Sequence, residues 1–217
     1  MTKVKVCCIA SREEAVLAIR HGAHAIGLVS AMPSGPGPIP EDRIAEIAAA
    51  VRPPTRTFLL TSLQSAEAIV AQHRRLRTTT IQIVDHLVEG HYREIRDALP
   101  GVELVQVIHV HGPESVDEAL AVAPQVDALL LDSGNQRLAV KELGGTGRTH
   151  DWSVSRRISD EAGVPVYLAG GLRPDNAAAA IAAVRPFALD LCSGVRTDGN
   201  LDEAKLAAFM AAVRSAA

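Results

Sequence analysis

Aromatic side chains are scarce in this chain of 217 residues, where Phe, Trp and Tyr together make up 3%. Stacking platforms for nucleic-acid bases need exposed aromatic rings, so this scarcity argues against such a surface. Basic residues are not in excess either, because 22 Lys and Arg stand against 25 Asp and Glu, for a formal net charge of -3. With a pI near 6.2, the chain lacks the basic patch typical of a nucleic-acid-binding protein, and we expect no such partner.

Long apolar runs are absent as well. No stretch approaches the ~20 consecutive apolar residues that a membrane-spanning helix needs, so we expect no membrane partner. Cysteine is sparse, and the chain carries only Cys7, Cys8 and Cys192. An odd number of cysteines without a signal peptide favours a reducing compartment. We therefore expect a cytoplasmic protein in which Cys8 and Cys192 are packing residues.

Apolar residues make up 47% of the chain, and with few aromatics the core must be filled by Ala, Val, Leu and Ile. No low-complexity linker divides the sequence, so we expect residues 1–217 to form one domain. Short apolar segments alternate with helical patterns along the whole chain. The expected strands lie at residues 3–9, 25–30, 56–60, 79–84, 102–108, 126–131, 164–168 and 187–191.

Repeated strand–helix units imply parallel strands joined by right-handed crossovers. Eight such units in a chain of this length favour one α/β fold in particular, the closed (β/α)8 TIM barrel. An open, doubly wound sheet is the alternative. The chain has no G-x-G-x-x-G after its first strand, which weakens the dinucleotide-binding version of that alternative.

The stretch that organises the chain spans residues 128–152. It begins as a buried strand that ends on the carboxylate of Asp132, and the glycine run at residues 144–147 then leads into a helix start at Asp151. An acid at the carboxyl end of a strand is a typical place for catalytic chemistry in α/β proteins. A glycine run before a helix can turn backbone N–H groups toward a phosphate. In a barrel, Cys7 and the later glycine turns would converge on the same face.

Five segments carry a pattern that extends over nearly the whole chain, at residues 5–9, 22–27, 130–152, 168–176 and 190–195. In order, they contain Lys-Val-Cys-Cys-Ile, Gly-Ala-His-Ala-Ile-Gly, Leu-Leu-Asp-Ser with Gly-Gly-Thr-Gly and Asp-Trp, Leu-Ala-Gly-Gly-Leu-Arg-Pro-Asp-Asn, and Asp-Leu-Cys-Ser-Gly-Val. Together they resemble the motifs of the phosphoribosylanthranilate isomerases of tryptophan biosynthesis, which are (β/α)8 barrels. A single Gly-Gly-Thr-Gly is a weak signal, whereas five motifs in order are a strong one.

The resemblance implies an Amadori rearrangement, in which an aminoaldose phosphate opens its ring and C2 loses a proton to give an aminoketose. It assigns Asp132 as the acid and Cys7 as the base, with no cofactor and no metal. A thiol serves as base only if nearby donors or positive charge lower its pKa. Lys5 shares a strand face with Cys7, so it either lowers that pKa or pairs with a carboxylate. The predicted phosphate-binding residues are Gly145, Thr146, Gly147, Gly170, Gly171, Ser193 and Gly194.

Several positions depart from the family pattern. The loop at residues 34–38 lacks the family's arginine, which is taken to meet the anthranilate carboxylate, and Arg196 replaces a glutamate. Cys8 replaces a glycine beside the predicted base. These changes suggest a different or broader substrate, or a carboxylate contact taken over by Arg196 or Arg148. The alternatives are therefore an isomerase or lyase for another phosphosugar, or a non-catalytic phosphate-ligand binder.

His109 and His111 share a strand face beside Asp85 and His86, so a metal site is conceivable there, although the family uses none. The expected partner of the chain is a small phosphorylated substrate. We expect the protein to be a monomer or a homodimer.

Overall fold

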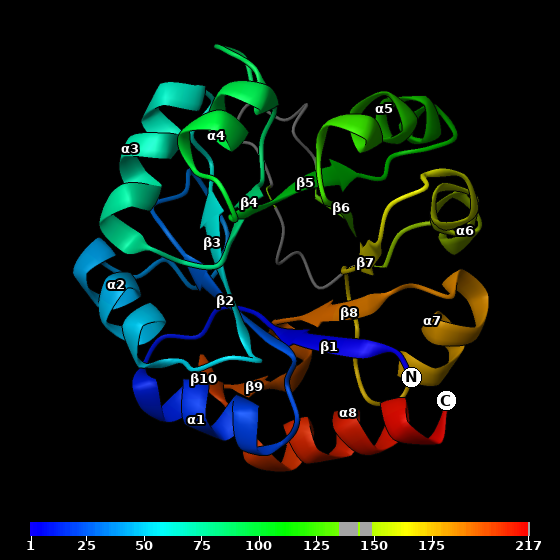
Figure 1. Cartoon of the computed structure of the whole chain (residues 1–217). Helices are drawn as coiled ribbons and strands as arrows, with labels where there is room; N and C mark the ends of the chain where they lie inside the picture. Colours follow the sequence, from blue (N-terminus) through cyan, green and yellow to red (C-terminus); the bar gives the residue numbers. More distant parts are fainter. Residues whose placement is uncertain (135–142, 144–148, 217) are drawn as a thin grey trace.

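Eight parallel strands close into a barrel in the computed structural model of this chain, which describes residues 1–134, 143 and 149–216 (Figure 1). The first strand pairs with the last, in a register that sets Val6 beside Leu191. This closure confirms the predicted (β/α)8 barrel and excludes the open sheet. The strands are β1 Lys3–Val6, β2 Ala25–Val29, β3 Arg56–Thr61, β4 Thr80–Ile83, β5 Glu103–His109, β6 Ala128–Asp132, β7 Val166–Leu168 and β8 Ala188–Leu191.

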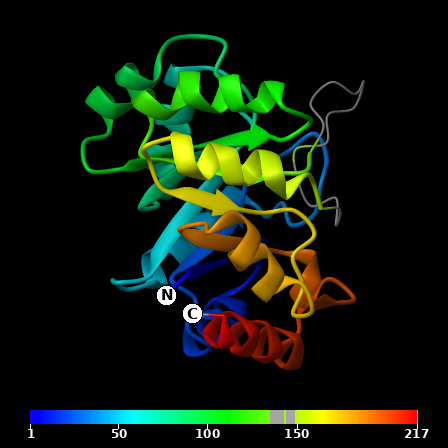
Figure 2. The same ribbon diagram turned by 90° about the vertical axis from the view of Figure 1, so that its right-hand side faces the viewer.

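Helices form a ring around the barrel, and the two chain termini lie close together (Figures 1 and 2). Within the described residues, none of the helices is long and apolar enough to span a membrane. The helices are α1 Arg12–Arg20, α2 Glu41–Ala50, α3 Ala66–Leu76, α4 Tyr92–Ala98, α5 Glu114–Val122, α6 Trp152–Glu161, α7 Ala177–Val184 and α8 Glu203–Ser215.

The sequence predicts a capping box at the start of α1, with Ser11 as the cap and Glu14 three residues on as its partner, and the structure differs from it in one detail. Ser11 caps the helix as expected, because its Oγ accepts a hydrogen bond from the Glu14 backbone N–H at 3.2 Å. The Glu14 carboxylate does not close the box on Ser11. It accepts instead from the backbone N–H of Ala10 at 2.9 Å. This places the carboxylate over the loop that follows β1.

A short hairpin between β8 and α8 was not expected. It consists of β9 (Arg196–Thr197) and β10 (Asn200–Leu201), which pair antiparallel. Asp198 and Gly199 turn the chain with φ values of 49° and 80°. Two consecutive residues with positive φ are typical of the tightest hairpin turns, in which Asp-Gly is a favoured pair. The strands are too short for periodicity to reveal them.

Side chains alternate between two buried layers, as in any closed parallel barrel. The larger layer lies between the strands and the helices and is built from Ile, Leu, Val and Ala. The smaller layer fills the barrel interior with residues such as Phe58, Leu130 and Tyr167. Lys5 lies completely buried near this interior layer. A charged residue in that place is costly unless it is paired, so it indicates a functional arrangement.

Candidate active site

A pocket lies at the carboxyl ends of the strands, the face on which (β/α)8 barrels build their active sites. Among the predicted site residues, it is lined by Cys7, Asp132, Gly170, Gly171 and Ser193. Residues far apart in the sequence therefore meet there. The remaining described lining residues are Cys8, Val29, Met32, Ser34, Gly35, Pro36, Leu60, Gln82, Val84, Leu143, Ala169, Leu172, Asp190, Leu191 and Cys192.

Cys7, the predicted base, follows directly after β1 and is held by a hydrogen bond from its backbone N–H to the carbonyl of Leu191 at 2.8 Å. Its thiol is free and buried. Burial raises the pKa of Cys7 to about 11, against the opposing effects of the Lys5 charge and a hydrogen bond from the Cys8 backbone. The thiol is therefore protonated at neutral pH. Gly27 on β2 makes room for it, because a Cβ at Gly27 would lie 2.7 Å from the Cys7 sulfur.

Lys5 pairs with a carboxylate, which was one of the two alternatives left open by the sequence. Its Nζ lies 2.8 Å from Oδ2 of Asp190, which comes from the neighbouring strand β8. Burial is the largest single effect on the pKa of Lys5 and would lower it, but the negative charge and hydrogen bond of Asp190, together with smaller effects of Cys7 and Tyr167, raise that pKa overall. Burial raises the pKa of Asp190, and the charge and hydrogen bond of Lys5 oppose that rise. Oδ1 of Asp190 is buried and has no hydrogen-bond partner among the described residues.

Asp132, the predicted acid, is the last residue of β6 and is 8% exposed. Its Oδ1 accepts a hydrogen bond from the backbone N–H of Ser133 at 2.7 Å, which fixes the carboxylate. His150 lies within electrostatic reach of Asp132. Burial lowers the pKa of His150, and the charges of Asp132 and Asp151 partly offset this effect. His150 was not among the predicted site residues, although its position directly before the helix cap Asp151 was a usable signal.

The turns after β7 and β8 line the pocket through Gly170, Gly171 and Ser193, whereas the predicted phosphate-binding residue Gly194 is not among the described lining residues. Gly170 and Gly171 adopt φ values of 87° and 60°, which favour glycine. Asn176 braces this turn, since its Nδ2 donates to the carbonyl of Gly171 at 3.0 Å. A Cβ at Gly194 would collide with the carbonyl oxygen of Leu172, so the turns after β7 and β8 pack backbone to backbone.

Four further residues of the predicted site fall outside the described residues. These are the phosphate-binding residues Gly145, Thr146 and Gly147 and the proposed carboxylate contact Arg148.

Arg196, the other proposed carboxylate contact, has different partners in the structure. Its Nη1 and Nη2 each lie 2.9 Å from an oxygen of Glu14, and Nη1 also donates to the carbonyl of Gly199 at 2.7 Å. Nη2 donates in addition to the carbonyl of Cys8. Arg196 does not belong to the described lining of the pocket. Its guanidinium therefore joins α1, the β9–β10 hairpin and the loop after β1.

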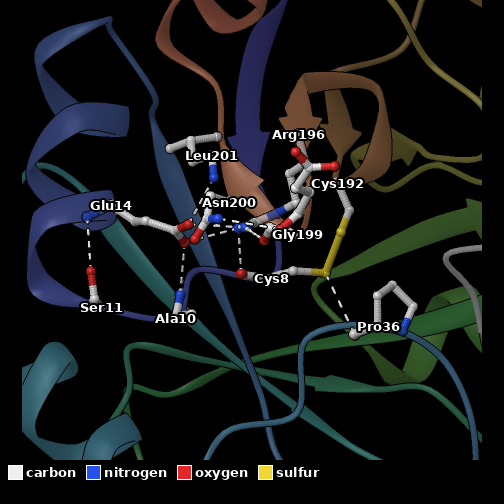
Figure 3. A network of polar contacts seen from close by, with 11 residues as sticks. Cys8, Ala10, Ser11, Glu14, Pro36, Cys192, Arg196, Gly199, Asn200 and Leu201 are labelled. Carbon is white, nitrogen blue, oxygen red and sulfur yellow. Dashed lines mark hydrogen bonds and ion pairs between the residues drawn. A yellow bond between two sulfur atoms is a disulfide. The ribbon is translucent and has the colours of Figure 1, made fainter.

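Cys8 and Cys192 form a disulfide, with Cα atoms 5.9 Å apart (Figure 3). The prediction that both are packing residues was wrong. They are 184 residues apart in the sequence, but barrel closure sets the ends of β1 and β8 side by side. The Cα separation lies within the range that a disulfide can bridge. Cys7 is the free cysteine of the chain.

The rim formed by the loop after β2 is uncharged. Met32, Ser34, Gly35 and Pro36 line the pocket from this side, and no described lining residue carries a positive charge. At the end of β5, Nε2 of His109 lies 3.0 Å from the carbonyl of Val84. Among residues 1–134, 143 and 149–216, no group of three or more His, Cys, Asp and Glu is arranged to hold a metal ion.

Comparison with known proteins identifies similar chains over nearly the full length. The family model described as N-(5'phosphoribosyl)anthranilate (PRA) isomerase matches residues 4–212. The N-(5'-phosphoribosyl)anthranilate isomerase of Methanocella arvoryzae is 34% identical over 206 residues, covering 95% of this chain and 94% of that protein. That of Halorubrum lacusprofundi is 36% identical over 213 residues, covering 97% and 96%. The crystal structure of phosphoribosyl anthranilate isomerase from Thermotoga maritima matches with a TM-score of 0.82 at 25% identity, covering 99% of this chain and 100% of that chain.

Proposed function

The chain belongs to the N-(5'-phosphoribosyl)anthranilate isomerase family, and on that premise we propose that it catalyses the isomerisation of N-(5'-phosphoribosyl)anthranilate in tryptophan biosynthesis. The reaction is an Amadori rearrangement, an aldose–ketose isomerisation within one molecule. One observation carries the proposal, namely that Cys7 and Asp132 line a single pocket together with the turns at Gly170 and Ser193.

Asp132 is the proposed acid. Protonation of the ring oxygen opens the sugar ring and leaves a positively charged iminium at C1. A buried carboxyl group with one oxygen anchored by a backbone N–H has a defined direction for proton transfer. The acid must be within hydrogen-bond reach of the ring oxygen, which a substrate seated in this pocket would satisfy.

Cys7 is the proposed base that removes the proton from C2. In the free protein its thiol is neutral, because burial raises its pKa to about 11. Ring opening puts a positive charge on the carbon next to C2, and this charge favours the thiolate at the moment when it is needed. Loss of the C2 proton gives an enolamine, which tautomerises to the aminoketose. The ammonium of Lys5, held by Asp190, adds a fixed positive charge on the same side.

The phosphate of the substrate is proposed to bind at the glycine turns. Backbone N–H groups of Gly170, Gly171, Ser193 and Gly194 are the candidates among the described residues, and Gly145, Thr146 and Gly147 complete the proposal. Close approach of the backbone to an anion requires the absence of a side chain. The sugar hydroxyls have a partner as well, since Oδ1 of Asp190 is a buried acceptor at the pocket.

A second candidate function is an isomerase for another phosphosugar, because the described pocket lining offers no positive charge to bind the anthranilate carboxylate. No described residue of the pocket lining is cationic, and Arg196 is bound to Glu14. A carboxylate enclosed without a partner is costly. Arg148 stays the proposed contact for the anthranilate compound. A substrate without this carboxylate would need no such contact.

Turnover of N-(5'-phosphoribosyl)anthranilate by the purified protein tests the proposal, with the aminoketose product quantified by chromatography. Cys7→Ser and Asp132→Asn should each lower kcat by about 100-fold or more, the usual contribution of an acid or base. Asp97→Asn makes the same chemical change on the exposed surface of α4 and should leave turnover unchanged. Absence of turnover in the wild type, with turnover of another aminoaldose phosphate, would favour the second candidate. Binding without exchange of the C2 proton in deuterated water would indicate a non-catalytic binder.

We also propose that the protein acts in the cytoplasm as a monomer or a homodimer. Light scattering and cell fractionation test these two statements separately.

A further inference from the structure

We propose that Cys8 is a positioning residue for the base Cys7, and that its disulfide with Cys192 makes the active site responsive to thiol–disulfide exchange. The inference rests on the proposed function for the role of Cys7, but the disulfide and its effect on the Cys7 thiol are measurable without substrate.

Cys8 lies where three loops of the pocket meet (Figure 3). It follows Cys7 directly, and its disulfide partner Cys192 leads into the turn at Ser193. The third loop comes from β2, and a Cβ at Gly37 of this loop would lie 2.6 Å from the Cβ of Cys8. Cys8, Cys192 and Pro36 all line the pocket. The disulfide thus ties the loop that carries the proposed base to the turn proposed to bind phosphate.

The backbone of Cys8 adopts a conformation that cysteine disfavours. Its φ value of 60° lies in the left-handed region, where glycine is at ease and a residue with a Cβ is strained. In this conformation the Cys8 backbone forms a hydrogen bond to Cys7 that stabilises the thiolate. The other charged groups that face Cys7 among the described residues are Lys5 on β1 and Asp190 on β8.

Two anchors hold Cys8 in this conformation. The disulfide fixes its side chain, and the guanidinium of Arg196 fixes its carbonyl. Arg196 is itself held by Glu14, whose carboxylate also accepts from the backbone N–H groups of Ala10 at 2.9 Å and Leu201 at 2.8 Å (Figure 3). When the disulfide opens, the side-chain anchor is lost and Cys8 is free to relax toward an ordinary φ value. Its N–H then moves away from the Cys7 sulfur, so the thiolate loses a stabilising hydrogen bond and a smaller fraction of Cys7 is present as thiolate.

The structure also offers a partner for the reduced state. Sγ of Cys8 lies 3.7 Å from the carbonyl oxygen of Pro36. In the disulfide this sulfur carries no proton and cannot donate. As a thiol it can donate weakly to Pro36, a contact that would hold Cys8 to the loop after β2 far less firmly than the covalent bond to Cys192 does. The two redox states therefore connect Cys8 to two different walls of the pocket.

The exchange step balances with a small thiol such as glutathione. Its thiolate attacks the half-buried Cys192 sulfur, because Cys8 is only 6% exposed. The protein S–S bond breaks, and Cys8 leaves as a thiolate that takes up a proton. A second thiolate then attacks the mixed disulfide, which releases the small disulfide and the Cys192 thiolate, itself then protonated. In total two electrons and two protons enter the protein, and glutathione disulfide reverses the reaction.

The first test needs no substrate. The protein is equilibrated with glutathione disulfide or with a dithiol reductant, and alkylation of Cys7 is followed by peptide mass spectrometry as a function of pH. Thiol titration of the denatured chain should find one thiol after oxidation and three after reduction. We expect reduction to slow Cys7 alkylation at a fixed pH below its pKa by about threefold to tenfold, the worth of one net hydrogen bond. Three thiols after oxidation, or equal alkylation rates, would overturn the proposal.

Matched variants separate the positioning role from a general loss of structure. Cys192→Ser opens the disulfide and keeps the strained residue, whereas Cys8→Gly opens it and removes the strain. We expect kcat of Cys192→Ser to match that of reduced wild type and to be the same in oxidising and reducing buffer. Cys8→Gly should have a higher kcat than Cys192→Ser and show no redox response. If Cys192→Ser does not fold, reduced wild type replaces it in the comparison.

Failure of the proposed function and failure of this inference give different results. A protein with no turnover but a redox-dependent Cys7 alkylation rate contradicts the function alone. A protein with full turnover in both redox states and an unchanged alkylation rate contradicts the inference alone.

Discussion

At the scale of single residues, the pocket depends on the absence of a side chain at Gly27. Its φ value is not in the left-handed region, so only space explains the glycine. A Cβ there would lie 2.7 Å from the Cys7 sulfur and 3.2 Å from Nζ of Lys5. Both neighbours are buried and fixed by the barrel, so neither can easily move.

Gly27→Ala should therefore displace Cys7 and Lys5, lowering the free energy of unfolding by about 1–3 kcal/mol, as for overpacking of a core. Urea denaturation measures the change. Gly112→Ala is the matched control, because a Cβ there meets only the end of the flexible Glu114 side chain. Equal effects of the two substitutions would show that the space at Gly27 is not critical.

The buried thiol of Cys7 predicts a pH dependence of stability. Burial raises the pKa of Cys7 from its ordinary 9.0 to about 11, so the folded state holds the proton more tightly than the unfolded state. This contribution to stability is fully present below pH 9, declines from pH 9 to pH 11 and is lost above. The free energy of unfolding of oxidised wild type should fall across this window relative to Cys7→Ala, in paired urea titrations. A parallel pH course for the two proteins would contradict the prediction.

Some residues of the site could be identified from the sequence and others could not. Cys7 and Asp132 follow strand patterns directly, so their place at the pocket could be predicted from local order and family motifs. The disulfide of Cys8 depends on how the ends of β1 and β8 meet. The number of cysteines in the sequence does not reveal how far Cys8 and Cys192 lie from each other in the fold. The partners of Arg196 could not be predicted for the same reason, since Glu14 is 182 residues away.

At the scale of elements, the β9–β10 hairpin is fastened to α1 by the Arg196–Glu14 ion pair and by a hydrogen bond from the Leu201 N–H to Glu14. The side chains of Arg196 and Glu14 are only 10% and 14% exposed. A pair so little exposed is screened weakly by solvent, and removal of one partner leaves a charge without compensation. Periodicity predicted every strand and helix of the barrel but not this hairpin, whose strands have two residues each.

Arg196→Met should lower the free energy of unfolding by about 3 kcal/mol, because Glu14 and the carbonyls of Cys8 and Gly199 lose their donor. Arg157→Met is the matched control on α6, where the partner Glu161 is 42% exposed and Arg157 itself is 58% exposed. An exposed helical pair of this kind contributes at most about 0.5 kcal/mol. Chemical denaturation of both variants measures the difference. A loss for Arg196→Met no larger than the control would contradict a fastening role.

At the scale of the whole molecule, the barrel closes where the first strand meets the last. Eight alternating units predicted this closure, because each unit is a local pattern and the number of units determines the architecture. The contacts that the closure creates are not local. The Lys5–Asp190 pair and the Cys8–Cys192 disulfide both cross the seam between β1 and β8.

A covalent bond across this seam should stabilise the whole barrel. The two sulfurs join positions 184 residues apart, so the disulfide removes much of the freedom of the unfolded chain. Reduction should lower the free energy of unfolding by about 2–4 kcal/mol, the usual range for a disulfide. Urea denaturation with and without a phosphine reductant measures this, and Cys192→Ser, which has no disulfide to lose, should have the same midpoint in both buffers. Wild type with one midpoint in both conditions would show that the seam is held by its strand pairing alone. A lower midpoint in the reductant for wild type only would assign the difference to the disulfide.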